Sequence, residues 1–77
     1  MPGPDRIAEV VGEWVEKAEN DLIVAAHTLR LGRACPTEAV CFHAQQCVEK
    51  YLKGLLVFRD TAFPRTHDIG ELLALAP

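Results

Sequence analysis

Four polar residues recur along one side of a helix expected between residues 37 and 59. His43, Gln46, Lys50 and Lys53 are separated by three, four and three residues, which places them on one stripe of an α-helix. Imidazole, amide and ammonium groups together can hold a phosphate or read the edge of a base. A solvated face, or a polar dimer seam without a ligand, would explain the same stripe, and the sequence leaves these alternatives open.

Asp21 interrupts the apolar side of the preceding helix. It lies about 20° from Trp14 on the helical wheel, inside the apolar stripe. A carboxylate there is costly to bury unless it is paired. His43 and Lys50 are the natural partners because both belong to the polar stripe. The sequence therefore predicts a contact between Asp21 and one of them, with a boundary position that reaches solvent as the alternative.

Three more polar residues extend this candidate site. Glu49 adds a carboxylate beside the stripe, and Arg65 and His67 precede a short helix that Asp68 opens. Because the chain must reverse after residue 59, we expect Arg65 and His67 to approach the stripe and add donors for an anion. The candidate ligand-binding residues are Asp21, His43, Gln46, Glu49, Lys50, Lys53, Arg65 and His67.

The groups that common catalytic mechanisms need are missing. The sequence has no Ser, no glycine-rich phosphate loop and no pair of carboxylates in a glycosidase setting. Cys35, Cys41 and Cys47 are spaced by six residues, which does not match a zinc site and suits small buried hydrophobes. We therefore expect no catalytic residue, no metal ligand and no cofactor.

Helices alone account for the hydrophobic pattern, which indicates an all-α fold. Apolar residues recur at intervals of three and four from Ile7 to Leu29 and again after Thr37. The second helix is apolar on more than one side, as expected for a central or interface helix. Asp68 and Glu71 have the spacing of a capping box. The expected elements are an irregular N-terminus at 1–6 and helices at 7–31, 37–59 and 68–76.

Length and composition limit the possible classes of protein. With 77 residues, the chain has room for one domain. Its composition, 49% hydrophobic and 25% charged residues, argues against disorder. A net charge of -3 gives no overall basic surface for nucleic acid. No membrane span or secretory signal is evident, so a reducing cytoplasm is the expected compartment. Two helices and the start of a third make a thin core, which favours a homodimer or larger oligomer, or a domain lacking C-terminal helices.

Three sequence blocks in a fixed order resemble one known family. They are WVEKAENDL at 14–22, CFHAQQCVEKYLKGLL at 41–56 and PRTHDI at 64–69. The middle block, of the form F-H-A-Q-Q-x-x-E-K-x-L-K-x-L-L, is the most specific. These blocks are similar to the HEPN family, whose name stands for higher eukaryotes and prokaryotes nucleotide-binding, and they cover nearly all of the chain from residue 13.

The resemblance implies an up-and-down helical bundle of HEPN type, two long helices and the start of a third, commonly as a homodimer. It also implies a nucleotide-binding or protein-interaction module that works with a minimal nucleotidyltransferase in a toxin-antitoxin-like system. Other members of the family are metal-independent ribonucleases with an Arg-x4–6-His motif, which this chain lacks. The alternative is therefore a subunit of a ribonuclease whose active groove forms across a dimer. The possible ligands are a nucleotide or RNA. We do not expect this chain itself to be an enzyme.

Overall fold

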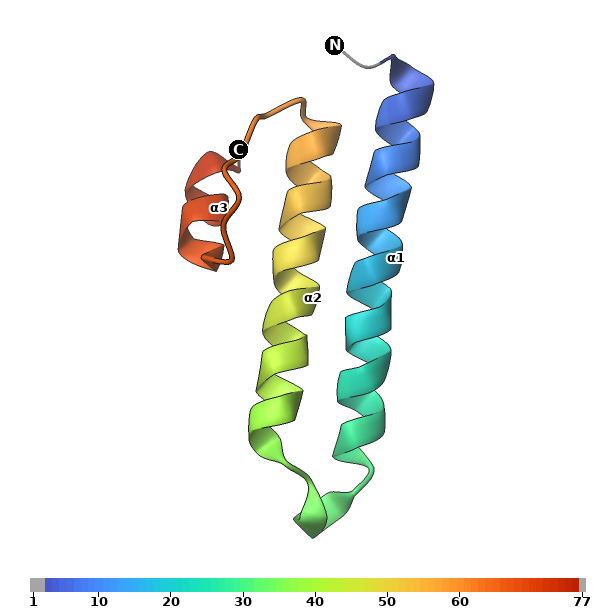
Figure 1. The fold of residues 1–77 in the computed structure, drawn as a ribbon, viewed down its shortest axis with the longest axis vertical. Coiled ribbons are helices and arrows are strands. Elements are labelled where there is room, and N and C mark those ends of the chain that lie inside the picture. The colour runs from blue at the N-terminus through green and yellow to red at the C-terminus, as the bar shows by residue number, and fades with distance from the viewer. Residues whose placement is uncertain (1–2, 77) are drawn as a thin grey trace.

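Three helices make up the fold, as the sequence predicts. A computed structural model describes residues 3–76; Met1 and Pro2, in the predicted irregular N-terminus, and Pro77 lie outside the described residues. The helices are α1 (Pro4–Leu29), α2 (Thr37–Phe58) and α3 (Ile69–Leu75), and a 3₁₀ turn, η1 (Gly32–Ala34), joins the first two. In Figure 1, α1 and α2 form a long antiparallel hairpin, and α3 lies beside α2 on the side away from α1.

The first helix is shifted towards the N-terminus relative to its predicted bounds. It begins at Pro4, within the segment predicted to be irregular, because proline is well suited to the first position of a helix, where no amide donor is needed. It ends at Leu29, before the predicted residue 31. Gly32 then adopts a φ of 59°, a left-handed conformation that glycine reaches without strain, and the chain turns through η1.

The third helix begins with a cap that partly matches the predicted capping box. The Asp68 carboxylate accepts a hydrogen bond from the amide of Glu71 at 3.2 Å. The Glu71 carboxylate does not accept a hydrogen bond from the Asp68 amide. It accepts one from the hydroxyl of Thr66 instead. The Asp68 amide donates to Thr66 Oγ1 at 3.0 Å instead, so Thr66 takes the second role in the cap.

Small residues allow the hairpin to close tightly. Ala18 and Ala25 on α1 and Cys47 on α2 are buried in the described structure. Gly54 favours this approach, since a Cβ added there would lie 3.2 Å from the Cβ of Trp14, closer than most side chains pack. A close hairpin leaves little room for large apolar side chains between the helices, so the core is narrow.

The chain after α2 turns back along that helix before α3 begins (Figure 1). Leu56 on α2 and Leu72 on α3 are both fully buried. Within residues 3–76, neither long helix combines the length and hydropathy that crossing a membrane requires.

Candidate functional site

Asp21 is the centre of a polar cluster inside the hairpin. Its side chain is only 10% exposed, and His43 Nδ1–H donates to its Oδ1 at 2.8 Å. Lys50 Nζ donates to the other oxygen, Oδ2, in a close ion pair. The predicted contact of Asp21 is therefore confirmed, and it involves both candidate partners.

The two partners of Asp21 hold its carboxyl group ionised. Burial by itself raises the pKa of Asp21, but the hydrogen bonds and positive charges of Lys50 and His43 lower the pKa below its usual value. Cys47 lies between these partners on α2, and burial together with the Asp21 charge raises the pKa of its thiol. A thiol kept protonated in this way is a poor nucleophile and a poor metal ligand.

Glu49 is the centre of a second cluster, on the side of α2 that faces the returning chain. It is buried, with 3% of its surface exposed. His67 Nδ1–H donates to Glu49 Oε1 at 2.9 Å, and Lys53 Nζ lies 3.5 Å from Oε2. The carboxylate therefore ties the segment before α3 to the middle of α2.

A hollow of about 370 Å³ opens next to this second cluster. Trp14 forms part of its wall, and Lys53 Nζ lies 5.5 Å from the centroid of the Trp14 ring. Lys17 approaches the same ring at 5.3 Å. The residues that line the hollow are Trp14, Lys53, Phe63, Pro64, Arg65, Thr66 and His67. A flat aromatic wall beside the cations Lys53 and Arg65 and the imidazole of His67 suits a ligand with both a ring and an anionic group.

The structure divides the predicted site into two parts. Lys53, Arg65 and His67 line the Trp14 hollow, as expected for residues brought together by the chain reversal. His43 and Lys50 turn towards Asp21 instead, because a buried carboxylate attracts the nearest cations of the stripe. Gln46 is half-buried on α2 and does not line the hollow.

Sequence reasoning missed Trp14, Phe63, Pro64 and Thr66 as lining residues, and Trp14 is the most important of them for a ligand with a ring. It was assigned to the apolar stripe of the first helix, where periodicity indicates only a core position. No pattern in the sequence identifies it as a lining residue, because its position opposite Gly54 is a tertiary contact. Which residues it then meets depends on the path of the chain after α2.

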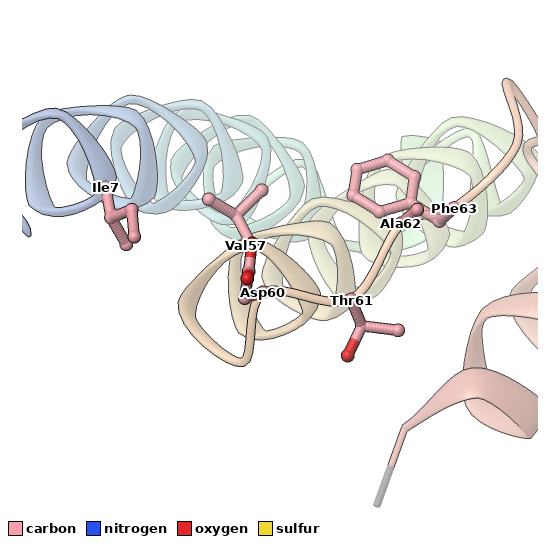
Figure 2. Close-up of a pocket in the computed structure, with 6 residues that line it drawn as sticks. All are labelled: Ile7, Val57, Asp60, Thr61, Ala62 and Phe63. Carbon is pink, nitrogen blue, oxygen red and sulfur yellow. The ribbon is translucent and has the colours of Figure 1, made fainter. Parts of the chain in front are cut away.

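A second hollow, of about 350 Å³, lies at the end of the hairpin. Figure 2 shows Ile7 from α1 and Val57 from α2 together with Asp60, Thr61, Ala62 and Phe63 from the following turn. Its lining is largely apolar, and the one charged residue in it is a carboxylate. It offers no cation to an anionic ligand, so the Trp14 hollow is the better candidate site.

The structure is that of a small all-α domain. It consists of a long antiparallel helical hairpin and a short third helix, with two polar clusters along α2. The family model for the HEPN domain matches residues 11–77, which is most of the chain. The chain therefore belongs to the HEPN family. No curated protein and no solved structure matches it.

Proposed function

We propose that this HEPN domain is a nucleotide-binding module whose ligand occupies the Trp14 hollow. The observation that supports this proposal is the convergence of Lys53, Arg65 and His67 around the indole of Trp14. The base or ribose would pack against Trp14 and Phe63, and the phosphates would face the nitrogen donors of Lys53, Arg65 and His67.

The charges around the hollow are compatible with an anionic ligand although Glu49 lies beside it. An ammonium group has three donors, and Glu49 engages Lys53 at the long distance of 3.5 Å. His67 remains 82% exposed at its side chain while it donates to Glu49. Among residues 3–76, Arg65 forms no ion pair. Its guanidinium can therefore bind a phosphate in a bidentate manner.

Calorimetric titration of ATP, GTP and a short RNA into the wild-type protein tests the proposal. Arg65→Ala removes an exposed cation of the hollow, and we expect nucleotide affinity to fall by about tenfold or more, as for the loss of a charge-assisted hydrogen bond. Arg59→Ala is the matched control, because Arg59 is equally a surface arginine but does not line the hollow. We expect this variant to bind like the wild type.

Lys50→Ala tests whether the nucleotide binds at the hollow or at another part of the polar stripe. Lys50 is bound to Asp21 and does not line the hollow, so this change should lower stability but leave nucleotide affinity nearly unchanged. Absence of nucleotide binding by the wild-type protein would contradict the proposal, as would equal affinities of the wild type and Arg65→Ala. If Lys50→Ala lost nucleotide binding and Arg65→Ala kept it, the ligand site would be the Asp21 cluster and not the hollow.

The family supports two further elements of the proposed function. A minimal nucleotidyltransferase is the proposed partner, in a toxin-antitoxin-like system in the cytoplasm. The alternative, a ribonuclease subunit, would require an RNA-cleaving Arg-x4–6-His motif that residues 1–77 do not contain. If the protein cleaved the short RNA in the calorimetric titration instead of only binding it, the ribonuclease function would be supported in place of the nucleotide-binding function.

A further inference from the structure

Glu49 is a buried carboxylate beside the Trp14 hollow, and nucleotide binding there does not by itself explain its presence. It is 3% exposed and does not line the hollow. Each of its oxygens nevertheless contacts a residue that does. Oε1 accepts from His67 Nδ1–H at 2.9 Å, and Lys53 Nζ lies 3.5 Å from Oε2. A negative charge in this place weakens the binding of an anion unless its contacts improve the donors around it.

The contact with Glu49 fixes which ring nitrogen of His67 a ligand can reach. A carboxylate only accepts hydrogen bonds, so Nδ1 carries a proton and is committed to Glu49 Oε1. The side chain of His67 is 82% exposed and lines the hollow, so Nε2 is the nitrogen that remains for a ligand. In a neutral imidazole with a proton on Nδ1, Nε2 can only accept a hydrogen bond. It can donate to a phosphate only after the ring has taken up a second proton.

Two negative groups would flank the His67 ring when a phosphate is bound. Glu49 supplies one on the Nδ1 side, and the phosphate would supply the other on the Nε2 side. Both favour the positively charged form of the imidazole. The carboxylates at the start of α3 have other partners, since Asp68 accepts from the Glu71 amide and Glu71 accepts from the Thr66 hydroxyl.

The positive groups around the hollow act in the opposite direction in the absence of a ligand. Lys53 from α2 and Arg65 from the returning chain line the same hollow as His67. Lys17 from α1 lies beside the Trp14 ring. These cations disfavour a further positive charge on His67, and a phosphate that pairs with them would remove much of this effect. Ligand binding and protonation of His67 should therefore favour each other.

We propose that Glu49 is a positioning residue that holds His67 as an imidazolium ion in the ligand-bound hollow, so that ligand binding takes up a proton at Nε2. The inference rests on the proposed function, because it concerns the same site. His67 Nε2–H then donates to the phosphate, while Nδ1–H keeps its hydrogen bond to Glu49, and the proton comes from the solvent. The group of the ligand that meets His67 is therefore an anionic oxygen and not a neutral hydrogen-bond donor.

Calorimetric titration of ATP at about pH 8, in buffers that differ in ionisation enthalpy, counts the protons taken up on binding. A free imidazole is mostly neutral at that pH, and a terminal phosphate has already lost its second proton, so the ligand itself exchanges none. We expect the wild type to take up about half a proton or more per bound ATP. Uptake of one full proton would raise the dissociation constant by about tenfold per pH unit.

Glu49→Gln is the most direct variant, because it keeps an acceptor for Nδ1–H and removes the negative charge. We expect it to lose the proton uptake, whereas a merely structural tie between α2 and His67 would leave the uptake unchanged. His67→Gln changes an exposed side chain and carries the test if Glu49→Gln does not fold; it should also take up no proton. His27→Gln is the matched control, since His27 is an exposed histidine of α1 that does not line the hollow.

Sulfate is a second probe, because it has no base and carries no proton near neutral pH. ¹⁵N NMR at about pH 8 should show both ring nitrogens of His67 protonated with saturating ATP or sulfate, and mainly Nδ1 protonated without them. Binding of ATP without proton uptake, or uptake that persists in Glu49→Gln or His67→Gln, would overturn the inference and leave the nucleotide-binding function in place. Protonation of His67 by sulfate without any binding of ATP would support the role of Glu49 and contradict the proposed function. A ring that neither probe protonates would overturn the inference.

Discussion

Asp21 shows how a single buried carboxylate can fix the pairing of two helices. It is the one acidic residue of α1 that is buried, and each of its oxygens accepts a hydrogen bond from α2. Neither donor is fully withdrawn from water, since the side chains of His43 and Lys50 are 29% and 24% exposed. The pair therefore avoids part of the desolvation cost of a fully buried ion pair.

Replacing Asp21 with Asn should destabilise the protein by about 2–4 kcal/mol, because Lys50 would lose its counter-charge in a partly buried place. Urea unfolding followed by circular dichroism measures this loss. Glu19→Gln, at an exposed carboxylate of the same helix, should change stability by less than about 0.5 kcal/mol. Equal effects of the two substitutions would show that the Asp21 cluster contributes nothing specific.

The same carboxyl group should make stability depend on pH in the acid range. Its pKa in the folded protein is lowered from the ordinary value of 3.8. A lowered pKa contributes stability that is fully present above that ordinary value and is lost as the pH falls through the folded pKa. The stability difference between wild type and Asp21→Asn should therefore shrink below about pH 4. A difference that stays constant between pH 7 and pH 3 would contradict this assignment.

At the scale of the element, α3 is the helix that depends most on its terminal contacts. Ile69–Leu75 is only seven residues long, and a helix of that length is not stable by itself. The Asp68 cap, the burial of Leu72 and the His67–Glu49 contact beside it hold the helix in place. Since His67 and Arg65 line the Trp14 hollow, the order of this segment also determines the shape of the candidate site.

Asp68→Ala should therefore destabilise α3 more than it destabilises the hairpin of α1 and α2. Loss of an N-cap costs about 1 kcal/mol, which corresponds to roughly fivefold faster hydrogen exchange of the α3 amides. Asp5→Ala is the control, because Asp5 lies in the first turn of α1, which has no side-chain cap. Unchanged protection of the Glu71 and Leu72 amides would show that the cap does not limit the stability of α3.

At the scale of the whole molecule, the core is thin for the surface that the chain displays. The buried apolar residues among those described are Ala18, Ala25, Cys47, Leu56 and Leu72. The three helices lie nearly in one layer, with principal extents of 48, 24 and 18 Å, so both sides of the hairpin face outwards (Figure 1). Large apolar side chains such as Leu22, Tyr51 and Phe58 are therefore left exposed on the described chain.

The amino-acid sequence by itself determined the helical class and the approximate bounds of each helix. Periodicity and breakers are local properties, and Pro36, Gly32 and Asp68 mark ends that lie within one to three residues of those observed. It also predicted a partner for Asp21 on the second helix, with a boundary position that reaches solvent as the alternative. Both of the partners considered proved to be bound to it.

Only the tertiary structure decided how the polar stripe divides. Helical spacing places His43, Lys50 and Lys53 on a common stripe but does not say which of them faces the neighbouring helix and which faces the returning chain. The close approach at Gly54 brings Lys50 to Asp21, and the reversal after α2 brings His67 to Glu49, beside Lys53 and Trp14. The Glu49–His67 and Asp21–Lys50 contacts join residues 18 and 29 positions apart, so they depend on how the helices pack rather than on the local pattern of any one of them.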